Sequence, residues 1–381
     1  MKSDIVIVGA GSIGLPLSYY LSKKGLKVVV LEKEASWGRG QNRAAIGGIR
    51  ATHSDAAKIR IGQESLDIVP RLETEHGFHV EWKRGGYLFV AYDETRENAF
   101  RELLSVQKAA GLGIDWIDPD RVAGLVPGIR REDLRGGTWS PGDGSASPLL
   151  VASAFYKLAI DAGVEFRFGE TVGEFDREGR RATRARTGKD VYEAGLFINA
   201  AGADAARIAE LLGESLPVNP DSHEAGVTEP VERFLGPMVV DIRPDSESGN
   251  YYYYQIASGQ IVFCITPKPQ AWGTDARSTS SFLPLVARRM VELHPRLANV
   301  KVRRTWRGLY PMTPDGLPVV GYARGTENVL AAAGMCGQGF MLGPGLGKIL
   351  AEATVNGPGA YGFIFDELSP YRTFEGMELL K

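Results

Sequence analysis

The chain has 381 residues, of which 44% are hydrophobic and 24% are charged. This is the length of roughly two domains and the balance of a folded globular protein, which excludes a disordered tail protein, a collagen-like chain and a small disulfide scaffold. The 44 Lys and Arg residues against 46 Asp and Glu residues give a net charge of -2. A nucleic-acid binder normally carries a basic excess that displaces counterions, so this class is excluded as well.

Cysteine and histidine usage gives no sign of a disulfide framework or a metal site. Cys264 and Cys336 lie far apart in the chain, and we expect no bridge between them. The five histidines are His53, His76, His79, His223 and His294. They form no ligand cluster in the sequence, so we expect solvated surface histidines and no metal.

No run of roughly 18 apolar residues occurs, so no segment is predicted to span a membrane. The apolar stretch over residues 1–17 superficially resembles a secretory signal, but Asp4 and the evenly placed glycines fit a buried strand and turn better. We therefore expect a cytoplasmic protein.

The first elements predict a βαβ unit. Residues 4–9 (DIVIVG) form a short apolar run that breaks at glycine, as in a strand buried on both faces. The apolar residues that follow recur at helical spacing until Gly25, and residues 27–32 (KVVVLE) form a second buried strand. A strand, helix and strand within this length predict a parallel pair.

Later elements follow from the same patterns. We expect a long helix over residues 54–76 with Ser54 as its N-cap, a strand over 85–92, and a helix that begins after Asp93 and ends at Gly111. Further predicted elements are a helix over 149–162, strands over 164–172 and 196–199, an antiparallel meander over 238–242, 250–256 and 260–266, and a final helix over 343–356.

The turn after the first strand has the features of a dinucleotide site. It reads GxGxxG and consists of Gly9, Ala10, Gly11, Ser12, Ile13 and Gly14. Gly9 allows the tight turn, Gly11 lets the backbone approach a pyrophosphate, and Gly14 lets the helix pack on the strand. Glu32 at the end of the second strand would accept hydrogen bonds from ribose hydroxyls, with Lys33 beside it. A glycine-rich turn without a ligand is the less consistent alternative in this context, and the pattern leaves NAD and FAD open.

The glycine-rich segment 331–354 favours FAD over NAD. It reads as an apolar strand, a turn and the start of a helix. We expect Gly343, Gly345 and Gly347 to bring a helix N-terminus close to a planar ligand, and the alternative is a helix packed closely in the core. A reduced flavin carries negative charge around its N1 and C2 carbonyl, which a helix N-terminus stabilises. An NAD enzyme needs no second helix of this kind.

Four separated motifs resemble the glycine oxidase, sarcosine oxidase and D-amino-acid oxidase family. They are the GAGSIG turn with Glu32, LFINAAGA (196–203), WRGLYPMTPDGLPVVG (306–321) and AAGMCGQGFMLGPGLG (332–347). The segments GGIRATHSDAAKIRI and GGYLFVAYDE are similar to the catalytic β subunit of dye-linked proline dehydrogenases and of multimeric sarcosine oxidase.

The resemblance implies a two-domain flavoprotein of the α/β plus α+β class. A discontinuous, Rossmann-like FAD-binding domain with a parallel sheet would consist of residues 1–80, 140–220 and 305–381. A substrate-binding domain with a mixed or antiparallel sheet would consist of residues 81–139 and 221–304.

The resemblance also implies further residues of the FAD site. Val172 would contact adenine through its backbone, and relatives that bind flavin covalently carry a Cys where this chain has Gly308, so we expect non-covalent FAD. The other residues implied at the cofactor are Gly48, Ile49, Ala200, Ala201, Gly202, Gly337, Gly339, Phe340 and Met341.

Members of this family oxidise a C–N bond by passing in effect a hydride from the substrate carbon to flavin N5, after which the imine product hydrolyses. The resemblance implies oxidation of a secondary or N-substituted amino acid or of a D-amino acid. Arg50 matches a substrate-side arginine of the sarcosine oxidases and is the expected carboxylate anchor, because Arg offers a bidentate fork. The alternative is a salt-bridged arginine without this role.

Three further positions differ from those of the relatives. Tyr310 stands where glycine and D-amino-acid oxidases place an Arg, and Met341 stands where monomeric sarcosine oxidase places a Lys. Tyr310 would hydrogen-bond the substrate or pack as a core aromatic. Gln338 stands where relatives commonly have His, and an amide hydrogen-bonds but does not titrate. The strand with Tyr251 to Tyr254 would place two rings on each face, either packed or lining the substrate cavity.

The electron acceptor is inferred from a missing cation. Oxidases of the family keep a Lys near flavin N5 that promotes reaction with O2, and the matching stretch 261–266 (IVFCIT) has none. This favours a dehydrogenase that passes electrons to a dye, a quinone or a partner subunit. We expect a homo- or hetero-oligomer, and peripheral association with the membrane if the acceptor is a quinone. The alternatives are an NAD-dependent oxidoreductase and a flavoprotein subunit with mainly a binding role.

Overall fold

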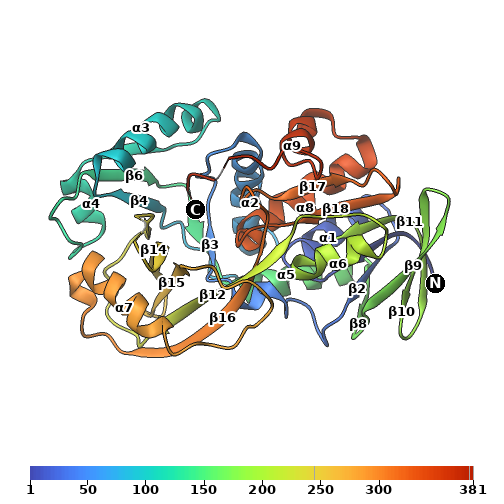
Figure 1. Ribbon diagram of the computed structural model, residues 1–381, viewed down its shortest axis with the longest axis horizontal. Coiled ribbons are helices and arrows are strands. Elements are labelled where there is room, and N and C mark those ends of the chain that lie inside the picture. The colour runs from blue at the N-terminus through green and yellow to red at the C-terminus, as the bar shows by residue number, and fades with distance from the viewer. Residues whose placement is uncertain (244, 377, 381) are drawn as a thin grey trace.

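The computed structural model describes residues 1–243, 245–376 and 378–380. They form two lobes, each built around a sheet of eight strands. In Figure 1 the first lobe lies on the right and the second lobe on the left. A short ladder of β3 (Gly48–Ile49) and β7 (Gly144–Ser145) forms a sheet of its own.

The first lobe contains a mainly parallel sheet with the strand order β17-β18-β11-β1-β2-β8, and β9 and β10 extend it beside β11. β1 is central and parallel to both neighbours, since Ile5 pairs with Val28 of β2 and with Leu196 of β11. The strands are β1 (Lys2–Val8), β2 (Val28–Glu32), β8 (Glu165–Phe168), β9 (Val172–Glu178), β10 (Arg181–Thr187), β11 (Val191–Asn199), β17 (Val319–Tyr322) and β18 (Val329–Ala333).

Helices cover both faces of this sheet. Among the described residues, one face packs against five helices in a core that includes Ile7, Leu17, Phe155 and Leu346, and these helices also contact one another. The opposite face buries Ile208 of a short helix. The helices of the first lobe are α1 (Gly14–Lys23), α2 (Ala56–Thr74), α5 (Pro148–Asp161), α6 (Ala205–Glu210), α8 (Gly339–Asn356) and α9 (Gly362–Glu367).

The second lobe contains a mainly antiparallel sheet with the order β16-β12-β15-β14-β13-β4-β6-β5. Its strands are β4 (Tyr87–Ala91), β5 (Asp115–Ile117), β6 (Gly136–Ser140), β12 (Asn219–Thr228), β13 (Met238–Asp241), β14 (Ser248–Gln255), β15 (Ile261–Pro267) and β16 (Val302–Met312). The helices α3 (Glu94–Ala109), α4 (Pro119–Leu125) and α7 (Phe282–Leu293) accompany it, and short 3-10 turns lie at η1 (Gln41–Ala44), η2 (Gly202–Asp204), η3 (Pro295–Leu297) and η4 (Gly359–Tyr361).

Most predicted elements are confirmed. The βαβ unit is present, the meander is the antiparallel set β13-β14-β15, and Asp93 caps α3 by accepting a hydrogen bond from the Arg96 N–H at 2.8 Å. The N-cap of α2 is a correction, because Asp55 and not Ser54 caps it by accepting from the Lys58 N–H at 2.8 Å. The helix predicted over 343–356 begins earlier, at Gly339, and is followed by α9.

The predicted limits of the two domains stay a prediction. The two sheets do draw their strands from alternating stretches of the chain, as a discontinuous domain requires. However, β16 runs unbroken through the predicted limit at residue 305 and pairs along its length with β12 of the second lobe.

The expectation of solvated histidines is wrong for three of the five. His53 and His294 are 0% exposed and His223 is 4% exposed. His294 lies between the Tyr253 hydroxyl at 2.8 Å and the Pro127 carbonyl at 3.1 Å, and burial lowers its pKa to about 4. A neutral imidazole with both nitrogens paired can be buried at low cost, which composition alone does not reveal.

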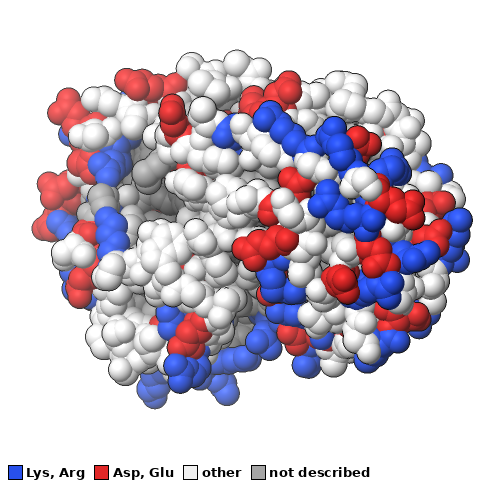
Figure 2. All heavy atoms as spheres, turned by 45° about the vertical axis from the view of Figure 1, so that its right-hand side comes forward, with Lys and Arg blue, Asp and Glu red and all other residues white. Residues whose placement is uncertain are grey.

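The surface carries both signs of charge. Lys and Arg side chains alternate with Asp and Glu side chains over much of the face drawn in Figure 2, and uncharged surface lies between these groups. Within the described residues, no helix is long and apolar enough to cross a membrane.

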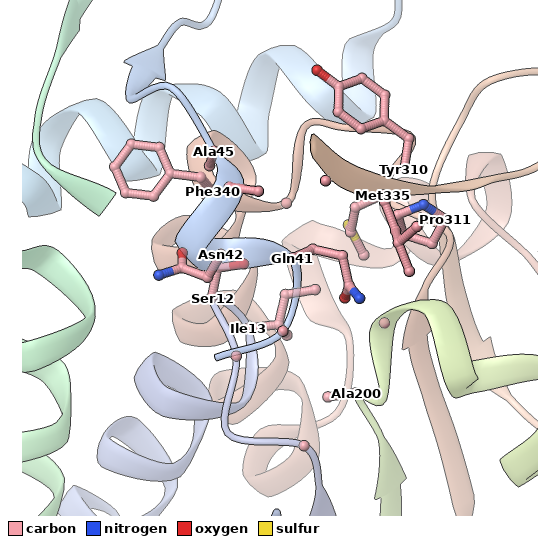
Figure 3. A pocket seen from close by; sticks show the side chains of 18 of the residues that line it. Ser12, Ile13, Gln41, Asn42, Ala45, Ala200, Tyr310, Pro311, Met335 and Phe340 are labelled. Carbon is pink, nitrogen blue, oxygen red and sulfur yellow. The ribbon is translucent and has the colours of Figure 1, made fainter. Parts of the chain in front are cut away.

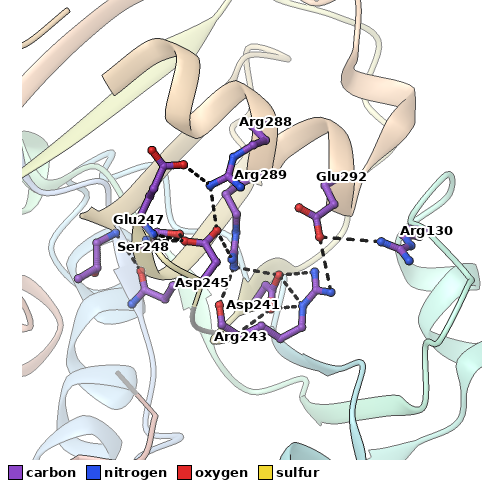
Figure 4. Close-up of polar contacts among 11 residues, drawn as sticks. Arg130, Asp241, Arg243, Asp245, Glu247, Ser248, Arg288, Arg289 and Glu292 are labelled. Atoms are coloured by element: carbon purple, nitrogen blue, oxygen red, sulfur yellow. Dashed lines mark hydrogen bonds and ion pairs between the residues drawn. The ribbon is translucent and has the colours of Figure 1, made fainter. Parts of the chain in front are cut away.

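An ion-pair network holds α7 against the sheet of the second lobe (Figure 4). Arg289 is 4% exposed and donates to Asp241 at 3.2 Å and to Asp245 at 3.0 Å. Asp241 is completely buried and also pairs with Arg243 at 2.7 Å. Arg288 on the same helix reaches Asp245 as well, at 3.1 Å, but from the solvent side with 46% of its side chain exposed.

We predict that Arg289→Ala destabilises the protein by about 3 kcal/mol, because it leaves the buried Asp241 carboxylate with one partner fewer. Arg288→Ala is the matched control on the next residue, and its loss should stay below about 1 kcal/mol, since exposed pairs contribute little. Urea unfolding of both variants measures the difference. Equal losses would contradict the buried role of Arg289.

Candidate active site

A cavity opens between the two lobes, with an empty volume of about 1510 Å³ that includes open solvent at its mouth. Figure 3 shows Ser12, Ile13 and Gln41 from the start of the chain on one side and Tyr310 and Met335 from its last quarter on the other. The predicted residues that line the cavity are Gly9, Gly11, Ser12, Ile13, Glu32, Lys33, Gly48, Val172, Ala200, Ala201, Gly202, Gly308, Tyr310, Gly337, Gly339, Phe340 and Met341.

The GxGxxG turn is shaped by close backbone contacts at two of its glycines. Gly9 has a φ of 111°, and a Cβ on it would lie 2.5 Å from the Ala200 carbonyl oxygen. A Cβ on Gly14 would lie 1.9 Å from the Gly9 carbonyl oxygen. Gly11 has nothing within 4 Å of the same position and faces the cavity. The free space beside Gly11, at the N-terminus of α1, therefore fits a pyrophosphate.

Glu32 is held by the backbone at the edge of the same space. Its carboxylate accepts from the Ala10 N–H at 2.8 Å and from the Glu34 N–H at 2.9 Å, and burial raises its pKa. Each carboxylate oxygen has a further lone pair for a ribose hydroxyl. Lys33 pairs with Asp204 at 2.6 Å, also at the cavity wall.

At the end of the cavity that holds the GxGxxG turn, the opposite wall is formed by β9 and the turn after β11. Val172 lines the cavity, and its carbonyl accepts a hydrogen bond from Arg207 at 3.1 Å. Gly202 has a φ of 58°, and a Cβ on it would lie 2.2 Å from the side-chain oxygen of Gln41. A side chain at this position would therefore be strained by the positive φ and would displace the end of the Gln41 side chain.

At the other end of the cavity, the start of α8 forms the wall. Gly337, Gly339, Phe340 and Met341 line it. Gly337 has a φ of 84°, and a Cβ on it would lie 2.2 Å from the Tyr310 ring. The N-terminus of α8, which carries the partial positive charge of a helix end, therefore borders the cavity.

Close packing in the core, the alternative given for Gly343, Gly345 and Gly347, is observed, and their expected effect of bringing the helix N-terminus close to a planar ligand stays a prediction. A Cβ on Gly343 would lie 2.0 Å from the Ser12 carbonyl oxygen, and one on Gly347 would lie 2.7 Å from the Leu17 nitrogen. A Cβ on Gly345 would meet α2 at 2.2 Å from a carbonyl oxygen. These glycines let α8 approach α1 and α2 at backbone distance.

A cluster of aromatic side chains from the second lobe faces the α8 end of the cavity. Tyr310 of β16 stacks on the His223 ring with centroids 3.8 Å apart, and its hydroxyl bonds the Tyr252 hydroxyl at 2.8 Å. Asp221 lies 2.9 Å from His223 Nε2. Burial raises the pKa of both phenols well above the usual value, so they are neutral at physiological pH.

Tyr310 was predicted at this site, but His223, Cys264 and Tyr87 were not, although all line the cavity. Tyr252 also lines the cavity, whereas Tyr251 and Tyr253 pack in the core of the second lobe. The face of β14 that carries Tyr252 therefore borders the cavity, and the opposite face packs in the core. The spacing of Asp221 and His223 on one strand is the sequence signal that could have indicated a paired imidazole, since alternate residues share a face.

Several predicted residues lie behind the cavity wall. Arg50 is 5% exposed, donates to the Thr52 carbonyl and, at 2.9 Å, to the Leu380 carbonyl, and lies over the Phe89 ring. Gln338 accepts a hydrogen bond from Lys58 at 3.3 Å. The predicted residues outside the described lining of the cavity are Ala10, Gly14, Ile49, Arg50 and Gln338.

Comparison with known proteins gives one consistent family. Residues 4–353 match the family model described as FAD dependent oxidoreductase. The β subunit of sarcosine oxidase from Arthrobacter sp is 29% identical over 366 residues, which cover 93% of this chain and 87% of the relative. Within the described residues, no group of three or more His, Cys, Asp or Glu side chains could hold a metal ion.

Solved structures are similar over nearly the whole chain. The L-proline dehydrogenase from P. horikoshii matches with a TM-score of 0.90 and 29% identity, over 97% of each chain. The glycine oxidase from Geobacillus kaustophilus shares the fold, with a TM-score of 0.81 at 23% identity over 92% of this chain and 94% of its own. With a family model that matches most of its length and a cradle that fits a dinucleotide, the chain belongs to the FAD-dependent oxidoreductase family, and its cofactor is FAD.

Proposed function

We propose that the protein oxidises the C–N bond of a secondary or N-substituted amino acid or of a D-amino acid at the α8 end of the cavity. Bound FAD supplies the two-electron chemistry. The observation that carries the proposal is the cluster of Tyr252, Tyr310 and His223, which faces the cavity at the end opposite the GxGxxG turn. The names of the relatives, a sarcosine oxidase subunit and a proline dehydrogenase, support this substrate class.

The two phenols are suited to orient an amino acid. Because one hydroxyl donates to the other, the second O–H of the pair, which has the Cys264 thiol beside it as a partner, can turn to donate to a substrate carboxylate, and both oxygens can accept from an amine. The stack with His223 and the Asp221–His223 hydrogen bond fix the plane of the Tyr310 ring. These residues would therefore hold the substrate in a single orientation.

Arg50 and Gln338 remain candidate site residues, but their hydrogen bonds in the structure change the roles we propose for them. Arg50 would serve as a carboxylate anchor only after its guanidinium exchanges the Leu380 carbonyl for the substrate, since that bond now occupies it. Gln338 would act through the position of α8 and not by proton transfer. FAD would be held without a covalent bond, because Gly308 offers no side chain for one.

A dehydrogenase fits the substrate end better than an oxidase. Cys264 of β15 lines the cavity, and burial raises its pKa to about 11, so its thiol is neutral. The basic residues among those that line the cavity, Lys33 and Arg207, belong to the nucleotide end. Without a Lys or Arg in the described lining of the substrate end, reduction of O2 at the flavin is less favourable. Electrons would then leave through a dye, a quinone or a partner subunit.

The first prediction concerns the substrate. Anaerobic addition of sarcosine, L-proline, hydroxyproline or a D-amino acid to the FAD-loaded protein should bleach the flavin absorbance with at least one of them, because two electrons pass to the flavin. The visible spectrum before and after each addition measures this. A flavin-loaded sample that stays oxidised with every amine would contradict the proposed reaction.

The second prediction concerns the acceptor. After reduction by an amine, an artificial dye should reoxidise the flavin much faster than air-saturated buffer does, because no Lys or Arg among the described residues lines the substrate end to stabilise developing superoxide there. Stopped-flow absorbance gives both rates. Reoxidation by O2 as fast as by the dye would identify an oxidase instead.

The third prediction concerns Tyr310. Tyr310→Phe should lower kcat/KM by about 10- to 100-fold, which corresponds to the loss of one buried hydrogen bond to the substrate, while the flavin spectrum is kept. Tyr251→Phe is the matched control, since the Tyr251 hydroxyl is buried in the core without a hydrogen-bond partner. If the two variants retained equal activity, Tyr310 would be a packing residue only.

A further inference from the structure

A completely buried lysine lies behind the α8 end of the cavity, and the proposed reaction does not use it. Lys58 is in the first turn of α2, with 0% of its side chain exposed. Its ammonium lies 3.2 Å from the Asp55 carboxylate and also contacts the Glu378 carboxylate. A buried ammonium costs several kcal/mol unless it is paired, so this lysine is held by specific partners.

The third partner connects Lys58 to the cavity. Its ammonium donates to the side-chain oxygen of Gln338 at 3.3 Å. Gln338 is the N-cap of α8, since its carbonyl accepts from the Leu342 N–H at 3.0 Å. The residues on either side, Gly337 and Gly339, line the cavity. The Lys58 side chain is thus bonded to the residue from which the cavity-facing turn of α8 begins.

The charges around Lys58 are balanced. The charged or titratable groups around its ammonium are Asp55 at the start of α2, Glu378 near the end of the described chain, Arg50 and the buried His53 after β3, and Cys336 before α8. Glu378 is itself completely buried, and its second hydrogen-bonded neighbour is the Ser54 hydroxyl at 3.0 Å. Because solvent does not screen the charges in this buried cluster, removal of one charge changes the local electrostatic potential more than it would at the surface.

We propose that Lys58 is a positioning residue for electron transfer: through Gln338 it holds the N-terminus of α8 against the pyrimidine end of FAD, and its charge, offset by Glu378, sets the midpoint potential of the flavin. The inference rests on the placement of FAD in the proposed function. A positive charge near this end stabilises the reduced flavin, which carries additional negative charge. Glu378 acts in the opposite direction.

The pH dependence of the potential should reveal the same lysine. Burial lowers the pKa of Lys58 to about 8. Because negative charge on the reduced flavin holds the proton of the ammonium more tightly, the pKa of Lys58 is higher in the reduced protein than in the oxidised protein. Between these two pKa values reduction takes up an additional proton, so the potential falls more steeply with pH there than on either side. Replacement of Lys58 by an uncharged residue removes this additional step.

The experiment compares midpoint potentials of the full-length, FAD-loaded protein, measured by titration with a chemical reductant. Lys58→Met should shift the two-electron equilibrium at least tenfold toward oxidised flavin, about 30 mV. Glu378→Gln should shift it toward reduced flavin, and Lys58→Arg should keep it near the value of the unchanged protein. Lys348→Met is the matched control, because Lys348 also bridges α8 and α2, through Glu64 at 2.7 Å, but neither residue is in the described lining of the cavity.

The signs of the shifts decide the outcome. If Lys58→Met and Glu378→Gln move the potential in the same direction, or if Lys348→Met moves it as much as Lys58→Met, the lysine is only a structural tether and the inference fails. If Lys58→Met does not fold, Glu378→Gln alone tests the inference, which then requires a shift of the midpoint potential toward reduced flavin. Because a chemical reductant replaces the substrate, these results do not depend on which amine the protein oxidises.

Discussion

Backbone-distance packing between α1 and α8 is the constraint on which the site depends. Gly343 and Gly347 present no side chain to α1, and any larger residue would push the two helices apart. Because the helices meet this closely, their N-termini open on one cavity although they lie at opposite ends of the chain. Two positively polarised helix ends can then act on the two ends of one nucleotide cofactor, the pyrophosphate and the flavin. The second lobe completes the cavity with the tyrosines of β14 and β16.

Local sequence patterns were sufficient to predict the helices and strands whose buried residues recur regularly along the sequence. β1 and β2 are continuous apolar runs because both of their faces are covered, and this made the βαβ unit predictable. The cap of α2 was not predictable, because Ser54 and Asp55 are adjacent and both residue types cap helices well. The glycines of α8 pack against α1 and α2, which the sequence pattern indicated only as the alternative to a role at the ligand. Their four-residue spacing was the available sign of a helix packed against another helix and not against a ligand.

The site was predictable where one short segment builds it and not where distant strands meet. The GxGxxG turn carries its function in its own spacing, whereas Tyr310 meets Asp221 only through the register of β16 with β12. His223 looked like a surface residue because no local pattern reports the stack above it. Arg50 looked like a free anchor because its partner, the carbonyl of Leu380, is distant in the sequence. Long-range register and side-chain pairing, which composition does not encode, decide these cases.

A crystal structure of the protein with FAD bound tests this account most directly. We predict one FAD that spans the cavity, with its pyrophosphate at the backbone N–H groups of residues 11–13 and its pyrimidine oxygens at those of residues 339–341. A cofactor that lies away from either of these two helix ends would contradict it.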